Sequence, residues 1–476
     1  MQSLQRDAGG APLAAQYKRP DEHPGRGRKR KFCRGAPTPA DNVADHLILS
    51  ERTTAMRSFF RHSNLRQATS HRPLLEPLEQ RRLLSGGVAL VETNLVSDIP
   101  GFAAHTDSAV VNPWGFTETP QGQFQLSDNG TGTAALFTAD GTSLGAPIVI
   151  PPPAGSPAGT TSTPNGQLTN STNDFVISKG GQSAPAAVLF STEDGTIAGF
   201  NSAVDPSNAI IAADQSSSGA VYKLLAMGTA GGANYLYATN FHNGTVDVFD
   251  KNFALHTFSP GQFTDPHTPA GFAPFGIKNV NGTLFVSYAK QDADKHDDVA
   301  GPGNGFIDEF DTSGHFLMRF ASGTAAGGTL TALNSPIGMT FAPKSFPQFG
   351  GDLLVGNFGD SHVSAFDPKS GKFLGQLQAS NGQPLVLNGG FNGPDTKGLW
   401  GIAFGNGQNG AGENTLFFAT GINDEQDGLF GAVNVVPQPH GNNPGHDHGD
   451  NNMNDQGDNN MHDHGQSHHR HTHHNG

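Results

Sequence analysis

Between Leu90 and Val436 the chain repeats one pattern of apolar and polar positions. A short apolar run is followed by a two-residue polar turn and then by a second apolar run that closes on Phe and Asp or Asn. The turns contain Asn-Gly, Asp-Gly or Gly-Asp, pairs that tolerate positive φ and let two strands reverse direction within two residues. Each unit is therefore predicted to be a β-hairpin, and the clearest ones begin at Phe124, Val188, Tyr235 and Leu353.

A second motif, usually a proline followed by an apolar residue and a glycine, precedes the hairpins. It recurs at residues 112–116, 273–277, 335–339 and 398–402. The last three of its glycines, Gly276, Gly338 and Gly401, are spaced by 62 and 63 residues. That interval suits a four-stranded propeller blade with long loops.

These repeats predict an all-β fold, a six-bladed β-propeller. The interval from Gly115 to Gly276 has room for three blades, and three more open at Gly276, Gly338 and Gly401. The outer strands of the first three blades are expected near Phe124, Val188 and Tyr235. Because a single blade exposes an apolar face, the ring must close. A strand near 89–95 is expected to complete the last blade beside 433–436.

Composition divides the chain into three parts: 1–87, a disordered basic leader; 88–436, the propeller; and 437–476, a disordered tail. The leader holds 16 Lys and Arg against 8 Asp and Glu, whereas the propeller region holds 11 against 29. So acidic a surface repels phosphate, which argues against a nucleic-acid partner. Cys33 is the only cysteine, so the propeller cannot form a disulfide, and no apolar run is long enough for a transmembrane helix. A monomer is expected.

The leader contains a candidate export signal. Residues 75–85, LEPLEQRRLLS, resemble the LEPR-type N-terminal signal of extracellular planctomycete proteins. The resemblance implies a secreted or cell-surface protein; the alternative is a short amphipathic helix that caps the fold. Met56 opens this stretch and is a candidate for the true translation start.

The tail is rich in histidine and aspartate. Ten of the 21 histidines lie between His440 and His474. Imidazole and carboxylate together suit borderline divalent metals, so weak Zn, Ni or Cu binding is expected, with a merely solvating tail as the alternative. The candidate ligands are His446, His448, His462 and His464.

An acidic insertion between two strands, residues 288–305, is a second candidate metal site. Four aspartates fall within seven residues, and converging oxygens are what Ca prefers. The alternative is a charged surface loop held by its own salt bridges and turns. The candidate ligands are Asp292, Asp294, Asp297 and Asp298.

Polar residues recur at equivalent hairpin positions in successive blades. If the blades close into a ring, these residues line one rim of the central channel and could hold a small polar ligand or a metal. They could equally be turn formers chosen for backbone conformation. The candidates for ligand binding are Asp128, Asn129, Glu193, Asp194, Asn240, His242, Asn357 and Asp360, with Asn423, Asp424 and Glu425 on the same rim.

Several blocks between Val91 and Val436, including FSTEDGTIAGFN, YATNFHNGTVDVFD and YAKQDADKHDDVAGPGNG, resemble an uncharacterised family of exported bacterial proteins. The resemblance implies a six-bladed propeller of the NHL or TolB-like kind and no established activity. No histidine of the propeller region sits in a motif that marks it as a catalytic base.

The leading hypothesis for function is a non-enzymatic extracellular binding or scaffold propeller that recognises a protein or glycan partner. The first alternative is a metal-dependent hydrolase or lactonase with its site in the central channel. The second is metal binding by the His-rich tail alone.

Overall fold

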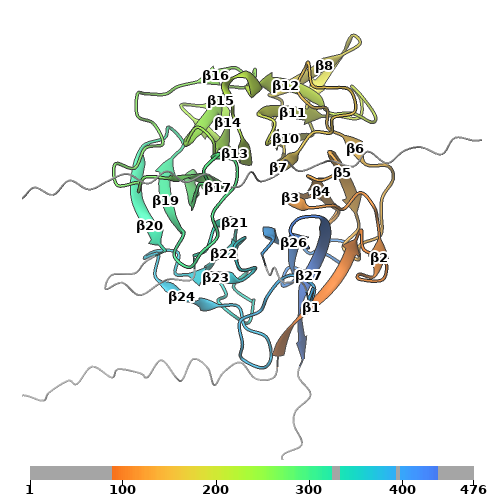
Figure 1. The fold of residues 1–476 in the computed structure, drawn as a ribbon, viewed down its shortest axis with the longest axis vertical. Coiled ribbons are helices and arrows are strands. Elements are labelled where there is room, and N and C mark those ends of the chain that lie inside the picture. Colours follow the sequence, from red (N-terminus) through yellow and green to blue (C-terminus); the bar gives the residue numbers. More distant parts are fainter. Residues whose placement is uncertain (1–87, 324–332, 393–396, 438–476) are drawn as a thin grey trace, which may run out of the picture. The chain divides into compact units, whose positions relative to one another are not determined.

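The computed structural model describes residues 88–323, 333–392 and 397–437, and there the chain is a six-bladed β-propeller (Figure 1). The predicted all-β class is confirmed: the helical structure in these ranges is one 3₁₀ turn, η2 (Ser216–Ser218). Within the same ranges no helix has the length and apolar character needed to cross a bilayer. The leader with its candidate signal and the tail with its candidate histidine ligands lie outside the described residues.

The first three blades are antiparallel sheets in which each successive strand lies farther from the axis (Figure 1). The first comprises β3 (Pro113–Glu118), β4 (Phe124–Asp128), β5 (Thr133–Phe137) and β6 (Ile148–Val149). The second comprises β7 (Pro164–Thr169), β10 (Val188–Thr192), β11 (Thr196–Phe200) and β12 (Ile210–Asp214), with an inserted hairpin of β8 (Val176–Lys179) and β9 (Gln182–Pro185). The third comprises β13 (Tyr222–Ala230), β14 (Ala233–Asn240), β15 (Thr245–Phe249) and β16 (Leu255–His256).

In the fourth and fifth blades the strands also follow chain order from the axis outward, whereas the two outer strands of the sixth blade come from the start of the propeller. The fourth comprises β17 (Phe272–Val280), β18 (Thr283–Lys290), β19 (Gly305–Asp311) and β20 (Phe316–Ser322). The fifth comprises β21 (Pro336–Phe341), β22 (Leu353–Asn357), β23 (Val363–Phe366) and β24 (Phe373–Gln376). The sixth comprises β25 (Leu399–Phe404), β26 (Leu416–Ile422), β27 (Asp427–Pro437), β1 (Val88–Ser97) and β2 (His105–Thr106).

The predicted hairpins are present, but their place in the blade differs from the expectation. The strands near Phe124, Val188 and Tyr235 are second strands, each hydrogen-bonded on both edges, and not outer strands. The true outer strands are β12, with five residues, and β6 and β16, with two residues each. Edges of two residues carry a weak sequence signal, and they also offer little backbone for edge-to-edge aggregation.

The predicted closure is confirmed. β1 pairs antiparallel with β27, with Ala89 opposite Val436 and Glu92 opposite Val433. The first described strand of the chain therefore lies inside the last blade, and the blade that closes the ring combines residues from both ends of the propeller. Pairing the two ends within one blade closes the ring, so that no blade is left with an uncovered apolar face.

Glycines of the second motif allow the inner strands to approach one another around the axis. A Cβ atom on Gly276 would lie 2.2 Å from the carbonyl oxygen of Ile337, and one on Gly401 would lie 2.7 Å from that of Trp114. Both contacts join one inner strand to the next: β17 to β21 and β25 to β3. Any larger residue would push the blades apart, since real Cβ atoms do not come so close to backbone.

Candidate functional site

Six side chains occupy the same position on the six inner strands, directly before the motif glycine or its equivalent. They are Trp114, Asn165, Lys223, Phe275, Ile337 and Trp400. Four of them form one buried cluster with Phe241 and Phe358. Trp114 stacks on Trp400 with ring centroids 3.4 Å apart, and Phe358 also stacks on Trp400, with ring centroids 4.0 Å apart. We call Trp114, Phe241, Phe275, Ile337, Phe358 and Trp400 the axial layer.

Lys223 is the charged member of this set. Its side chain is 1% exposed, and its ammonium lies 4.9 Å from the ring centre of Trp114 and 5.6 Å from that of Phe241. The ammonium forms an ion pair with Glu193 and lies 3.4 Å from Oδ1 of Asp297. Burial disfavours the charged form, but the two carboxylates outweigh it and raise the pKa of Lys223. The lysine is therefore a fixed positive charge at the axis.

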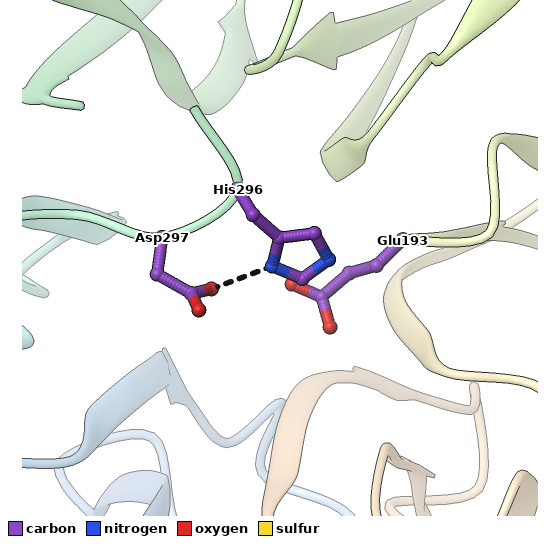
Figure 2. Close-up of side chains that lie close together, drawn as sticks. All are labelled: Glu193, His296 and Asp297. Carbon is purple, nitrogen blue, oxygen red and sulfur yellow. Dashed lines mark hydrogen bonds and ion pairs between the residues drawn. The ribbon is translucent and has the colours of Figure 1, made fainter. Parts of the chain in front are cut away.

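The acidic insertion carries two more groups to the same place. It connects β18 to β19 in the fourth blade, and Gln291 anchors it by donating from Nε2 to the carbonyl oxygen of Phe241 at 2.6 Å. Asp292 Oδ1 accepts a hydrogen bond from the backbone N–H of His296 at 2.9 Å, which tightens the turn. As Figure 2 shows, His296 and Asp297 then face Glu193, which comes from the β10–β11 hairpin of the second blade.

His296 and Asp297 form a hydrogen-bonded pair. Nδ1 of His296 lies 3.0 Å from Oδ1 of Asp297 (Figure 2). This hydrogen bond raises the pKa of His296 and, acting on the partner, lowers that of Asp297 to about 2. A carboxylate that holds Nδ1 leaves Nε2 of a neutral imidazole free to accept a proton or bind a metal. Glu193, His296 and Asp297 each offer a ligand atom, and these atoms all lie within 4.8 Å of one another.

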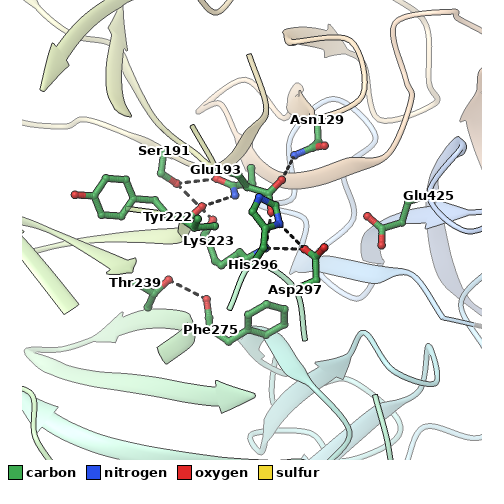
Figure 3. Close-up of polar contacts among 12 residues, drawn as sticks. Asn129, Ser191, Glu193, Tyr222, Lys223, Thr239, Phe275, His296, Asp297 and Glu425 are labelled. Carbon is green, nitrogen blue, oxygen red and sulfur yellow. Dashed lines mark hydrogen bonds and ion pairs between the residues drawn. The ribbon is translucent and has the colours of Figure 1, made fainter. Parts of the chain in front are cut away.

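Glu193 and Glu425 are held by amides from the first blade. Asn129 donates to Glu193 Oε2 at 2.9 Å (Figure 3). Asn112 donates to Glu425 Oε2 at 2.8 Å. Asn112 in turn accepts a hydrogen bond from the indole N–H of Trp400 at 2.8 Å, which ties the polar groups to the axial layer. Burial, followed by the negative charge of Glu193, raises the pKa of Glu425 to about 7.

The rim candidates fall into two groups. Asn129 and Glu193 meet across two blades, and Glu425 is held by Asn112, as described above. The others make local contacts, with Asp128 accepting from the Ala135 N–H, Asn240 donating to Asp247, and Asp360 accepting from the His362 N–H. Asp194 accepts from Ser162, Asn357 accepts from the Asn334 N–H, and His242 joins the site only through its carbonyl oxygen, which accepts from Gln291.

The four aspartates of the insertion also separate. Asp297 reaches the axis, while Asp292 serves the turn and Asp294 is exposed. Asp298 lies beside Lys223 and Asp297, and burial raises its pKa to about 6. The structure thus groups Asp297 with Glu193 and His296, apart from Asp292 and Asp294.

Sequence reasoning missed Lys223 and gave His296 no role. The motif that marks the axial position has no proline and no glycine in the third blade, where Tyr222 and Leu224 stand in their places. Lys223 could have been found by extending the motif through the second and third blades at the spacing of the others. His296 had no such signal, because its position depends on the path of a long loop.

Comparison with known proteins places the chain among viral relatives. No family model matches it. It is 33% identical over 324 residues to the uncharacterised protein L690 of Acanthamoeba polyphaga mimivirus, covering 67% of this chain and 81% of that protein. It is 28% identical over 366 residues to the uncharacterised protein R648 of the same virus, covering 76% of this chain and 83% of that protein.

Solved structures with a similar backbone are far more distant in sequence. Virginiamycin B lyase from Staphylococcus aureus is 16% identical with a TM-score of 0.41, over 73% of this chain and 100% of that one. The soluble aldose sugar dehydrogenase of Escherichia coli is 13% identical with a TM-score of 0.40, over 73% of this chain and 100% of that one. The identity and coverage shared with L690 establish that this chain belongs to the same protein family as that mimivirus protein.

Proposed function

We propose that the axial end of the propeller binds a divalent cation through Glu193, His296 and Asp297, and that the cation in turn binds an oxygen-bearing small ligand. The observation that carries this proposal is the convergence of three metal-ligating groups from two blades on one point, within 4.8 Å of one another. Two of the three are exposed, so a ligand could reach the cation from solvent.

The balance of charge at the site supports a bound cation. Four carboxylates, Glu193, Asp297, Asp298 and Glu425, surround the single ammonium of Lys223. Burial together with this excess of negative charge raises the pKa values of Glu425 and Asp298, so both carboxyls hold protons well above their ordinary range. A divalent cation supplies the missing positive charge and releases those protons.

The ligand set favours Zn²⁺ or Mn²⁺ over Ca²⁺, because an imidazole nitrogen takes part. Ligand atoms about 2.1 Å from a metal lie at most about 4.2 Å from each other. The side chains of His296 and Asp297 must therefore close slightly, which their exposure of 47% and 67% permits. Lys223 stays on the buried side of Glu193, where it holds the carboxylate in place.

The same groups offer a second candidate function, hydrolysis of an ester or lactone. In this function Glu193 and Asp297 alone would hold the cation, and His296, oriented by Asp297 and with its pKa raised, would serve as the general base near neutral pH. Water bound to the cation would then be the nucleophile. Both candidate functions require a bound cation, so cation binding is tested first.

Tryptophan fluorescence gives a readout confined to this site. The chain has two tryptophans, Trp114 and Trp400, and both belong to the axial layer next to Lys223. Titration of the full chain with buffered Zn²⁺ or Mn²⁺ should give a saturable change in their emission. Metal bound by the histidines of residues 438–476 would not depend on Glu193. Glu193→Gln should weaken the transition at least about tenfold, since one charged ligand is lost.

The matched control is Glu413→Gln, which removes a carboxylate from an exposed residue between β25 and β26. This variant should titrate like the wild type. The proposal is wrong if the emission does not respond to either metal, or if Glu193→Gln and Glu413→Gln both respond as the wild type does. Export, and a protein or glycan partner, stay predictions.

A further inference from the structure

A cavity of about 110 Å³ lies in the central channel on the other side of the axial layer. Inner-strand residues two positions beyond the axial layer line it, one from each blade. They are Phe116, Gln167, Leu225, Ile277, Met339 and Ile402. All but Gln167 are apolar, so the wall offers hydrocarbon contact from five blades.

Lys278, next to Ile277 on β17, is the one titratable residue among those that line the cavity. Its side chain is exposed, and the protein that surrounds it displaces part of the water around the ammonium, which lowers the pKa of Lys278. Among the described residues none forms an ion pair with Lys278. Lys223 differs in this respect, because two carboxylates raise its pKa.

The remaining polar group of the wall is already engaged. Gln167 donates from Nε2 to the carbonyl oxygen of Gln125, and its Oε1 accepts from Ser127 at 3.2 Å. An incoming ligand therefore meets one free charge, the ammonium of Lys278, in an otherwise apolar space. A lone positive charge in such surroundings gains most from an anion that brings its own apolar body.

We propose that this cavity binds a small organic carboxylate, with its oxygens on Lys278 and its hydrocarbon chain against Phe116, Leu225 and Met339. The size of the cavity limits the chain. An apolar cavity of about 150 Å³ holds one benzene ring of six carbons, so about 110 Å³ suits a hydrocarbon chain of three or four carbons, with the carboxylate beyond it at Lys278. This site is separate from the proposed cation site, because the axial layer lies between them.

The test uses butyrate and the full chain, with binding followed by calorimetry. Wild-type protein should bind butyrate, and Lys278→Met should weaken binding at least about tenfold, the value of one charge-assisted hydrogen bond. Lys278→Arg, which keeps the charge, should retain most of the affinity. Lys372→Met removes an exposed lysine from the β23–β24 turn and should bind as the wild type does. Circular dichroism should confirm that each variant is folded.

Inorganic phosphate separates a carboxylate site from general anion binding. Phosphate has no apolar body and should bind at least about tenfold more weakly than butyrate. The proposal is overturned if the wild type does not bind butyrate, if Lys278→Met binds it equally well, or if phosphate binds as tightly. Glu193→Gln should leave butyrate affinity unchanged, so a failure of the cation proposal does not decide this one.

Discussion

The two sides of the axial layer differ in chemistry although the same six blades build both. On one side, hairpins and a long loop place Glu193, His296, Asp297 and Glu425 around Lys223. On the other, inner strands present apolar side chains and the single ammonium of Lys278. Strand residues must fit between neighbouring blades, so packing restricts them, whereas hairpin residues can vary without disturbing the fold. In this propeller the strands hold the blades together, and the hairpins bring most of the polar chemistry.

The largest expected effect tests whether the axial layer separates the two sides. Trp400 is 3% exposed and stacks between Trp114 and Phe358. Trp400→Ala should lower the free energy of unfolding by about 4 kcal/mol, the usual cost of deleting a large buried ring. It should also make the remaining Trp114 accessible to acrylamide, which quenches exposed indoles.

The control for this change is Trp400→Phe, which keeps a ring in the stack and loses the hydrogen bond to Asn112. It should cost about 1 kcal/mol and leave Trp114 shielded. Denaturant unfolding followed by circular dichroism measures both variants. If Trp400→Ala leaves Trp114 as protected as it is in Trp400→Phe, the axial layer is not the barrier between the two sides.

The second prediction removes the charge that sets the polar side apart. Lys223→Met gives the third blade an apolar residue, as four other blades have at this position. It should lower the free energy of unfolding by about 3 kcal/mol, because the buried Glu193 loses its ion-pair partner. The affinity for Zn²⁺ or Mn²⁺ should rise, since the lysine no longer competes for the carboxylates.

A double-mutant cycle checks the cause of both effects. Lys223→Met combined with Glu193→Gln should cost less than the sum of the two single changes, because neither partner is left unpaired. Unfolding curves and tryptophan titrations give the two readouts. Additive losses of stability, or a metal affinity that is unchanged in Lys223→Met, would show that the ion pair and the cation site are unrelated.

Much of the fold could be predicted from the sequence because each blade repeats the same packing problem. The glycines that allow inner strands to approach, such as Gly276 and Gly401, and the turn pairs between strands are direct signals of geometry. The closing strand could be predicted as well, since a ring of blades needs one. The short outer strands could not, because two-residue edges such as β6 leave no pattern.

The candidate site was only partly visible in the sequence. Glu193 and Asn129 occupy a repeated hairpin position, so their place on the rim could be predicted. Which carboxylates meet depends on the path of the 291–304 loop, and that path is set by contacts such as Gln291 with Phe241, which are remote in sequence. For the same reason the sequence predicted one cluster of aspartates in this loop. In the structure Asp297 lies at the axis, whereas Asp294 is exposed to solvent.

The smallest expected effect concerns pH and the excess of negative charge on the polar side. The folded protein holds the Glu425 proton up to about pH 7, whereas the unfolded chain releases it near 4.5. The folded state therefore binds more protons between these values, and stability should fall as the pH rises from 4.5 to 7. Asp298 acts in the same direction between 3.8 and about 6.

Glu425→Gln isolates this contribution. The amide cannot ionise, so the variant should gain about 1 kcal/mol over the wild type at pH 7.5, or about 2 °C in Tm, and lose most of that advantage at pH 5. Glu92 and Asp308, whose pKa values burial also raises to about 7, keep their own pH dependence in both proteins and cancel in the difference. Saturating Zn²⁺ should shrink the difference at pH 7.5, because the cation neutralises the same charge. A pH-independent difference between Glu425→Gln and the wild type would mean that Glu425 is already ionised in the folded protein, and the argument for a missing positive charge would lose its support.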